Sequence, residues 1–409
     1  MKYILDQIGS LLTLEGAVHK RGRHVSPEDL SLVKNAAMVF DKKIIWTGPR
    51  DQLPSSFKKL KKINARGRMV LPGFVDSHTH LVFAGDRSNE FEMRLAGKTY
   101  QDIAKAGGGI SASCQATRLQ SKNDLFKSAL ARVNNFLKQG VTTVEIKTGY
   151  GLSLEAEKKC LDVIEGLKKK SRATIKATYL AAHSVPPEFK GRQGEYVETL
   201  AKEWLPLLKK KIDYVDMFID DGYFTVEDAR VLLTEAMKIK IPSKLHADEL
   251  KLSGGSRIAV EYGALSCDHL LCVTKTEAQL IAKSETTATL LPATAFFLKK
   301  SYAPARMLLD AGARVALATD FNPGTAPSQD IALVGALAAL EMKMRIDEVI
   351  VSLTLNGAYA LGMETRKGAC LPGFDADFQI VESQSPAGLF YNFGQRFNLP
   401  EVYCSGRPV

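Results

Sequence analysis

Short apolar runs recur along the middle of this chain and alternate with longer segments whose apolar positions repeat every three to four residues. Short runs of this kind are typical of buried strands, and the longer periodic segments are typical of amphipathic helices. The expected strands are 74–78, 142–146, 174–181, 214–219, 243–246, 264–268, 287–291 and 315–319, and the helices between them include 154–170, 226–238 and 304–311. This alternation predicts an α/β protein with a TIM-like (β/α)8 barrel rather than an open sheet.

Both ends of the chain have a different pattern. Residues 1–66 are predicted to form short strands and turns, with a hairpin in which 36–40 and 44–46 flank an Asp-Lys-Lys turn. Residues 373–381 are again strand-like. We therefore expect a small β-sandwich domain built from both termini, 1–66 and 360–409, beside a barrel domain over 67–359.

The composition is that of an ordinary globular protein, with 45% hydrophobic and 24% charged residues. The net charge of +10 is spread over short lysine runs such as 58–62, 168–170 and 209–211. Because no basic arm or aromatic-rich RNA motif accompanies these runs, they predict a solvated surface and no nucleic-acid partner. The positive field would still favour small anionic substrates.

The cysteines and the hydropathy indicate the cellular compartment of the protein. Six cysteines are scattered without a Cys-X-X-Cys pair, which is typical of reduced thiols in the cytosol. The first residues place an aspartate where a signal peptide needs its apolar region. No segment reaches the roughly 18 apolar residues of a membrane span. We expect a cytoplasmic protein with no membrane partner.

A His-Thr-His run at 78–80 ends the first expected strand. Side chains two apart on a strand share a face, so these imidazoles would point the same way. Alone, such a pair is a weak metal signal, and two ordinary polar residues at a strand end are the favoured interpretation. Other polar residues that directly follow expected strands are His183, His246, His269 and Asp320, whereas His19 and His24 lie in a polar N-terminal stretch where surface roles are expected.

The strand ends matter because barrel enzymes carry their chemistry at the C-terminal ends of the strands. Three histidines and one aspartate there would suit one divalent metal such as Zn²⁺ or iron, with a position left open for water. Asp320 could ligate and also accept the proton of an activated water. His269 and Glu249 are nearby titratable groups suited to proton transfer and to stabilising developing charge.

This arrangement resembles the amidohydrolase superfamily. The resemblance implies hydrolysis of an amide, lactam or amine bond by a metal-activated water. Binuclear members carry a carboxylated lysine after the fourth strand. Here that strand ends in Asp-Met-Phe-Ile-Asp-Asp-Gly at 216–222, without lysine, so the pattern is similar to the mononuclear subtype.

Within the superfamily the intervening motifs resemble the imidazolonepropionase family, most clearly over residues 60–380. The motifs lie at 80–87, 107–110, 145–151, 182–187, 244–249 and 318–324. The resemblance implies hydrolysis of the lactam C–N bond of 4-imidazolone-5-propanoate to N-formimidoyl-L-glutamate, in histidine catabolism. It also implies one divalent metal per subunit, Zn²⁺ or Fe²⁺/Fe³⁺, and a homodimer.

The resemblance also implies roles for individual residues. The metal ligands would be His78, His80, His246 and Asp320, and the catalytic residues Glu249, His269 and Asp320. Arg87, Tyr150, His183, Glu249, Asn322, Gly324 and Thr325 would bind the substrate. A propanoate calls for a cation, and a guanidinium such as that of Arg87 can bind a carboxylate with two donors.

Other interpretations stay open. Arg87 could be a surface cation, Tyr150 could pack over a glycine turn, and Asn322 could belong only to a turn. The glycines at 107–109 lack a following Gly-Lys-Ser/Thr, so a loop near the active site is expected there rather than a phosphate cradle. The chain could also be another mononuclear amidohydrolase, an amino-heterocycle or formimidoyl deaminase, or a non-catalytic barrel kept as an assembly module.

Overall fold

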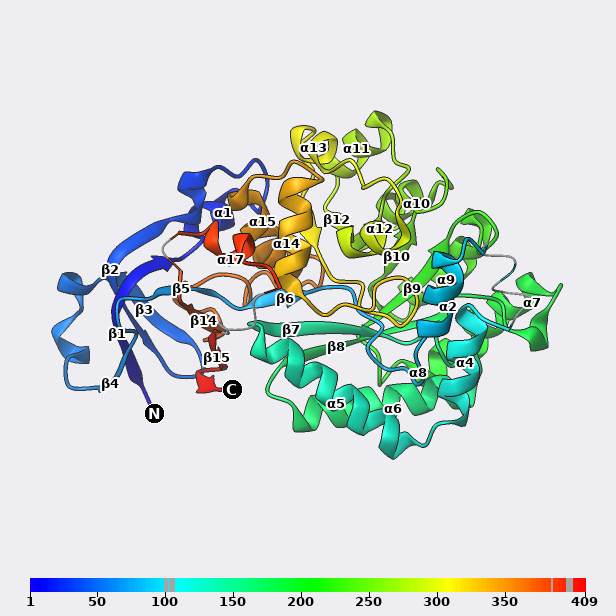
Figure 1. The fold of residues 1–409 in the computed structure, drawn as a ribbon, viewed down its shortest axis with the longest axis horizontal. Coiled ribbons are helices and arrows are strands. Elements are labelled where there is room, and N and C mark those ends of the chain that lie inside the picture. Colours follow the sequence, from blue (N-terminus) through cyan, green and yellow to red (C-terminus); the bar gives the residue numbers. More distant parts are fainter. Residues whose placement is uncertain (99–101, 103–106, 384, 395–399) are drawn as a thin grey trace.

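The computed structural model describes every residue except 99–101, 103–106, 384 and 395–399. Two eight-stranded sheets organise it (Figure 1). The barrel sheet is parallel and runs in sequence order through β6 Phe74–Asp76, β7 Val141–Lys147, β8 Thr174–Ala182, β9 Tyr214–Ile219, β10 Lys244–Ala247, β11 Ser266–His269, β12 Thr287–Leu290 and β13 Val315–Leu317. The expected α/β barrel is confirmed.

The barrel closes just beyond the ends of its first and last strands. Thr79 bridges Phe321, and the backbone N–H of His80 donates to the carbonyl of Phe321 over 2.9 Å. The N–H of Asp320 donates in turn to the carbonyl of His78 over 3.0 Å. The closing seam therefore lies at the histidine pair itself.

The second sheet is formed by both ends of the chain, as expected. It consists of β1 Tyr3–Leu12, β2 Leu32–Phe40, β3 Ile44–Pro49, β4 Lys61–Asn64, β5 Met69–Pro72, β14 Phe378–Val381, β15 Glu401–Cys404 and β16 Arg407–Pro408. The predicted hairpin is the antiparallel pair β2 and β3. Phe40 of β2 packs edge-on against Phe378 of β14 with 5.1 Å between ring centroids, although β1 and β5 separate these strands in the sheet. The sheet therefore curls around its own apolar core.

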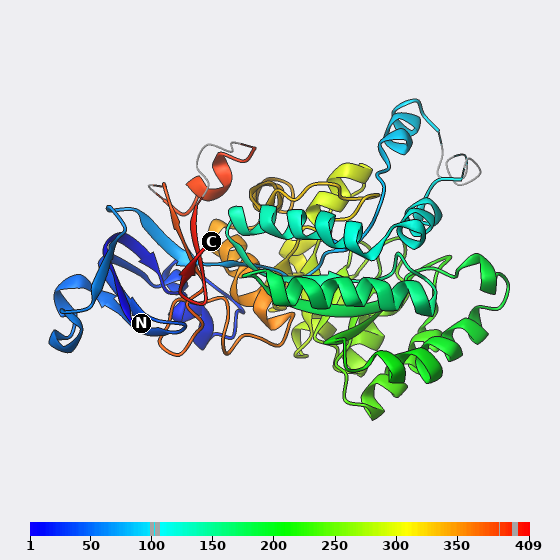
Figure 2. The same ribbon diagram turned by 90° about the horizontal axis from the view of Figure 1, so that it is seen from below.

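The helices surround the barrel (Figures 1 and 2). The α-helices are α1 Glu15–His19, α2 Ser88–Leu95, α4 Ile110–Leu119, α5 Lys122–Lys138, α6 Leu154–Lys170, α7 Gln193–Glu198, α8 Leu205–Leu208, α9 Val226–Lys238, α10 Gly255–Glu261, α11 Lys275–Ala282, α12 Pro292–Leu298, α13 Ala305–Asp310, α14 Ile331–Leu340, α15 Ile346–Leu353, α16 Leu355–Tyr359 and α17 Gly388–Tyr391. Short 3₁₀ turns cover Pro27–Leu30, Arg50–Gln52, Ser55–Phe57 and Pro187–Phe189, and a π-helical turn covers Thr199–Trp204. No helix in the described ranges is both long and apolar enough to cross a membrane.

The link between the two sheets orients the barrel. β5 belongs to the terminal sheet and β6 to the barrel, with only Gly73 between them. The N-terminal ends of the barrel strands therefore face the terminal sheet. Their C-terminal ends, which lead into the histidines, face away from it, toward α2 and α4 (Figure 1). The limits 66/67 and 359/360 of the two domains stay a prediction.

Local sequence signals account for the best-predicted elements. Helices α6 and α9 and strand β9 have the predicted bounds. α9 begins at a capping box, in which the Thr225 hydroxyl accepts from the N–H of Asp228. Helices α2 and α4 and the group α14 to α16 were not predicted, since they lie in long connections after the first and last strands where no alternating pattern marks them.

One helix contact supports the strand that leads into the histidine pair, and it yields a prediction. A Cβ at Gly357 of α16 would lie 2.7 Å from the carbonyl oxygen of Val75 in β6. We expect Gly357→Ala to lower the free energy of unfolding by about 1–3 kcal/mol, as overpacking does, measured from the urea midpoint. Gly194→Ala is the matched control, because its Cβ would meet nothing within 4 Å. A Gly357→Ala midpoint at or above that of the unmodified protein would contradict the tight contact.

Candidate metal centre and active-site cavity

Three histidines expected to ligate a metal converge at the barrel's closing seam. Ring nitrogens of His78, His80 and His246 all lie within 4.8 Å of one another, and all three residues are buried. The Nε2 atoms of His78 and His80 face each other at 3.3 Å. Asp320 Oδ1 lies 3.4 Å from each of those two nitrogens. The predicted N₃O donor set is thus assembled in one place.

The donors fit a divalent cation. Both ring nitrogens of His246 and Nδ1 of His80 are buried without a hydrogen-bond partner in the described part of the chain. Buried polar atoms are rarely left unpaired, and facing lone pairs would repel. One divalent metal between the three imidazoles and the carboxylate would bind one ring nitrogen of each histidine and remove the repulsion between the facing nitrogens, and nitrogen and oxygen donors suit Zn²⁺ or iron.

Carboxylates behind the ligands orient them. His78 Nδ1 lies 2.6 Å from Asp268 Oδ2, and since a carboxylate only accepts, this nitrogen carries the proton and leaves the Nε2 lone pair free. Asp216 accepts from the backbone N–H of His246 at 3.1 Å. Its other oxygen lies 3.0 Å from His246 Nδ1, close enough for an ion pair although the alignment is not that of a hydrogen bond.

A fully buried ammonium connects these carboxylates. Lys147 Nζ lies 2.8 Å from Asp216, 2.9 Å from Glu145 and 3.6 Å from Asp268. Lys244 adds a second buried cation, 3.7 Å from Glu145. Burial alone would lower the pKa of Lys147, but the three carboxylates outweigh it and raise that pKa. The floor of the site is therefore a network of buried ion pairs.

The same environment keeps the imidazoles neutral. Burial, with the neighbouring positive charge of Lys147, lowers the pKa of His78 and of His246 well below the ordinary value. Neutral imidazole is the form that ligates metals. Burial opposes ionisation of Asp320, but its contact with His80 and the charge of His269 hold its pKa at about 2. His78, His246 and Asp320 are therefore in their ligating forms near neutral pH.

Glu249 and His269 lie beside the donors as a pair. His269 Nδ1 is 3.4 Å from Glu249 Oε2. Burial raises the pKa of Glu249, which favours the protonated carboxyl, while the charge of His269 opposes the shift. Asp220 holds this segment in place by accepting from the backbone N–H groups of Glu249, Leu250 and Lys251 at 2.7–3.0 Å.

A cavity of about 740 Å³ opens over the donors. All residues expected to bind substrate line it, namely Arg87, Tyr150, His183, Glu249, Asn322, Gly324 and Thr325, together with His80, His246, His269 and Asp320. Arg94 and Glu90 also line it, and the sequence did not single them out. The structure therefore brings the predicted site residues together, while their individual roles stay predictions.

At the wall of the cavity, the ring of His183 has one nitrogen that donates a hydrogen bond and one that can accept. Its ring stacks on His80 with centroids 5.1 Å apart, and its Nδ1 lies 3.2 Å from the carbonyl oxygen of Gly149. A carbonyl only accepts, so Nδ1 carries the proton and Nε2 is an acceptor. Burial lowers the pKa of His183 well below the ordinary value, which keeps the ring neutral.

The side chain of Asn322 lines the cavity but makes its hydrogen bonds within its own turn, the alternative that the sequence left open. Its amide nitrogen donates to the carbonyl of Asp320 at 2.6 Å, and its amide oxygen accepts from the N–H groups of Gly324 and Thr325 at 2.8 and 2.7 Å. The side chain therefore ties the turn that follows Asp320. Its direct contact with substrate stays a prediction.

Sequence reasoning assigned no role to Lys147, Asp216, Asp268, Asp220 or Glu90. One signal was present: Glu145 and Lys147 are charged residues two apart in an apolar strand, so they share a face just as His78 and His80 do. Two such charges in a buried strand indicate an internal ion network.

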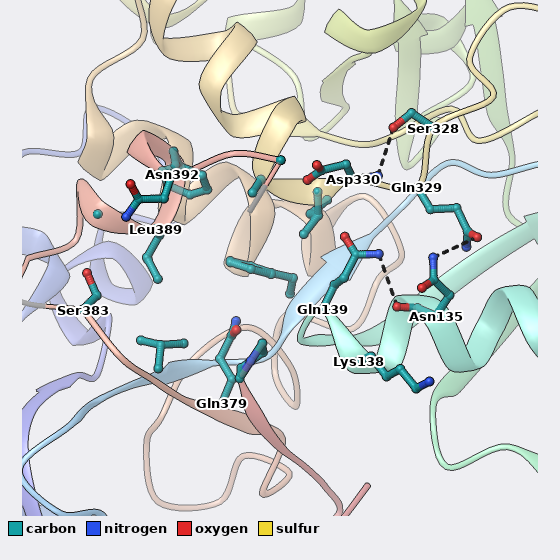
Figure 3. Close-up of a pocket in the computed structure, with 18 of the residues that line it drawn as sticks. Asn135, Lys138, Gln139, Ser328, Gln329, Asp330, Gln379, Ser383, Leu389 and Asn392 are labelled. Carbon is teal, nitrogen blue, oxygen red and sulfur yellow. Dashed lines mark hydrogen bonds between the residues drawn. The ribbon is translucent and has the colours of Figure 1, made fainter. Parts of the chain in front are cut away.

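A second cavity, of about 680 Å³, lies away from the histidines, between the end of α5, the start of α14 and α17 (Figure 3). Its polar side chains largely bond one another or the backbone; for example, Asn135 donates to Gln329 at 3.2 Å and Gln139 to the carbonyl of Asn135 at 3.2 Å. None of the predicted site residues lines it.

Comparisons with known proteins agree with this geometry. The amidohydrolase family model matches residues 69–409. An imidazolonepropionase of Bdellovibrio bacteriovorus is 48% identical over 100% of this chain and 97% of its own length. One from Porphyromonas gingivalis is 42% identical over the same shares. The chain belongs to the imidazolonepropionase family of amidohydrolases.

Solved structures of other amidohydrolase-like enzymes share the fold of this imidazolonepropionase family member at low sequence identity. A triazine hydrolase variant superposes with a TM-score of 0.76 at 16% identity, covering 100% of this chain and 94% of that one. A zinc-bound adenosine deaminase from Xanthomonas campestris gives 0.70 at 16% identity, covering 99% and 92%. These likenesses show the fold alone.

The support of His78 by Asp268 yields a second prediction. Asp268→Asn keeps the shape but removes the charge that holds the Nδ1 proton, so we expect zinc affinity to fall about 10–100-fold. Competition with a fluorescent chelator measures it. Asp29→Asn is the control, because Asp29 is equally a buried carboxylate but is paired with Lys20 and Ser26 in the N-terminal region. Unchanged zinc affinity in Asp268→Asn would show that Asp268 does not orient His78.

Proposed function

We propose that this protein hydrolyses the lactam C–N bond of 4-imidazolone-5-propanoate to N-formimidoyl-L-glutamate, in histidine catabolism. The observation that carries the proposal is the convergence of His78, His80, His246 and Asp320 beneath a cavity that Arg87 also lines. Full-length relatives named imidazolonepropionase support the same reaction.

The proposed cofactor is one divalent metal, Zn²⁺ or iron, held by those four side chains. When bound, such a metal lowers the pKa of water and polarises a carbonyl oxygen. The protein's contribution is the fixed position of the donors and the exclusion of bulk water from a buried floor.

Asp320 is the proposed proton acceptor for the attacking water. Its carboxylate is ionised near neutral pH, because its pKa is about 2. The Thr294 hydroxyl donates to Oδ2 at 2.6 Å, so Oδ1 is the oxygen left facing the imidazoles. Oδ1 is therefore the oxygen proposed to accept the proton of the water.

Glu249 and His269 are proposed to stabilise charge on the opening lactam and to protonate its leaving ring nitrogen. Burial raises the pKa of Glu249, which favours the protonated form that a proton donor needs. Their 3.4 Å separation is within ion-pair range, although it is not aligned as a hydrogen bond. His269 has φ of +78°, a strained value for a residue with a side chain, which the surrounding fold maintains at this position.

Arg87, Tyr150 and His183 are proposed to bind the substrate. Arg87 would bind the propanoate through two donors. The acceptor Nε2 of His183 would suit a ring N–H of the imidazolone. An amino-heterocycle deaminase would share the metal donors but would have no use for a carboxylate-binding arginine. A non-catalytic barrel would not need the complete donor set.

Two further expectations belong to the proposal. A homodimer and a cytoplasmic location stay predictions of the sequence. All six cysteines are free thiols, which supports a reducing compartment.

The deciding test is a turnover assay on the zinc- and iron-loaded protein. We expect loss of 4-imidazolone-5-propanoate and appearance of N-formimidoyl-L-glutamate, followed by absorbance and mass spectrometry. A panel of amino-purines, amino-triazines and formimidoyl amino acids is assayed in parallel for ammonia. Ammonia release from a panel member, with no opening of the imidazolone, would overturn the proposal.

The role of His269 has its own test. We expect His269→Ala to lower kcat by about 10²–10⁴-fold, the contribution of a general acid or base, with a much smaller effect on KM. Stopped-flow or steady-state kinetics on metal-loaded enzyme measures both values. His19→Ala is the control, because His19 is exposed in the terminal region. A kcat close to that of the unmodified enzyme would remove His269 from the mechanism.

A further inference from the structure

The carboxylate of Glu90 joins two segments at the wall of the cavity. Glu90 lies on α2 and its side chain is only 8% exposed. Its Oε2 accepts from Nε and Nη2 of Arg87 at 2.9 and 2.7 Å. Its Oε1 accepts from the backbone N–H of Gly109, directly before α4, at 2.7 Å. Both oxygens of one carboxylate are therefore engaged, each on a different segment.

This contact fixes the guanidinium of Arg87 from one side, and Gly324 fixes it from the other. A Cβ at Gly324 would lie 1.8 Å from Nη1 and 2.6 Å from Cζ of Arg87, so the guanidinium lies directly against that glycine. Nη1 has no hydrogen-bond partner among the described residues, and Arg87 lines the cavity. The donors left over form one edge, available to a ligand.

Glu90 also sets the charge around that edge. Arg94 lies close by, with Nη2 donating to the carbonyl of Gly324 at 3.1 Å. Burial and the charge of Arg87 lower the pKa of Arg94, which remains a cation at neutral pH. Two guanidiniums and one carboxylate leave one unit of positive charge, which matches a single carboxylate on the ligand.

We propose that Glu90 is a positioning residue that sets the preference of this site for a substrate with a carboxylate side chain. It does so by holding the Arg87 guanidinium in one plane while its own second oxygen anchors the segment at Gly109. Glu90 is not proposed to touch the substrate. The inference rests on the proposed role of Arg87 as the carboxylate-binding residue.

The substitution Glu90→Gln separates positioning from simple packing. An amide has one acceptor oxygen and one donor nitrogen, so it can serve either Arg87 or Gly109 but not both. In either orientation an N–H group would face another N–H donor. The side-chain volume is nearly unchanged, so the packing of α2 is retained.

The measured quantity is the preference ratio, kcat/KM for 4-imidazolone-5-propanoate divided by kcat/KM for the corresponding propanamide. We expect Glu90→Gln to lower this ratio about 10–100-fold, the contribution of a hydrogen bond to a charged group, mainly through KM. Arg87→Met should give a similarly low ratio, and Glu90→Gln added to Arg87→Met should lower it no further. Glu92→Gln is the matched control, because Glu92 is an exposed carboxylate on the same helix.

Three results would overturn the proposal. An equal loss on both substrates, with the ratio retained, would show that Glu90 only supports the fold. A higher ratio in Glu90→Gln would show that Glu90 competes with the substrate for Arg87. A ratio near one in the unmodified enzyme would show that no carboxylate site exists.

Two further arms keep the test independent of folding and of the proposed function. Gly324→Ala displaces the same guanidinium without touching Glu90, so it should lower the ratio in the same way even if Glu90→Gln folds poorly. If the unmodified protein does not turn over the imidazolone, the proposed function fails on that result alone. Calorimetric binding of imidazole-4-propanoate against its amide, on the same variants, then tests Glu90; equal affinities in Glu90→Gln and the unmodified protein would reject it.

Discussion

The buried ammonium of Lys147 is the interaction on which the histidine site depends. His78 and His246 come from different strands, and each is held by its own carboxylate, Asp268 or Asp216. Two carboxylates in a buried floor would repel each other, but the Lys147 ammonium lies within 3.6 Å of both and offsets that repulsion. Removing one partner of a buried ion pair costs about 3–5 kcal/mol, because the remaining charge is left without compensation. The orientation of two metal donors and the stability of the barrel interior therefore rest on the same cation.

The seam that closes the barrel is a second constraint on the position of the histidine pair. Backbone hydrogen bonds between His78 and Asp320, and between His80 and Phe321, join the first strand to the last. The register that closes the barrel is thus also the register that sets two imidazoles beside a carboxylate. Asp320 adopts φ of +53° at this point. Such a conformation costs free energy and persists only where surrounding contacts enforce it, here the seam on one side and the Thr294 hydroxyl on the other.

The sequence predicts the barrel well because apolar strands and amphipathic helices are local patterns. It also predicts the donors, since a barrel gathers whatever polar residues follow its strands. It does not predict the support beneath them, because Lys147 and Asp216 lie 69 residues apart and nothing local shows that they meet. The role of Glu90 was not predicted from the sequence for a different reason. Glu90 lies on α2, in a long connection that carries no strand pattern, and its partner Gly109 is 19 residues away in the sequence.

The floor of the site, beneath the cavity, and its rim, the loops around the cavity, are thus held in place by different interactions. The floor consists of strand residues fixed by the sheet and by buried ion pairs. The rim consists of connecting segments, each tied by one polar side chain to backbone N–H groups: Glu90 to Gly109, Asp220 to residues 249–251, and Asn322 to Gly324 and Thr325. Under the proposed function, a change in one of these loop contacts is expected to move the side chains that bind the substrate while the proposed metal donors stay in place. Solved structures with this fold at 16% identity include a triazine hydrolase variant and an adenosine deaminase, as expected where the barrel is kept and the loops carry the specificity. In this chain these contacts hold the segments that carry or adjoin Arg87 and Glu249, so under the proposed function three buried polar side chains maintain the loops expected to choose the substrate.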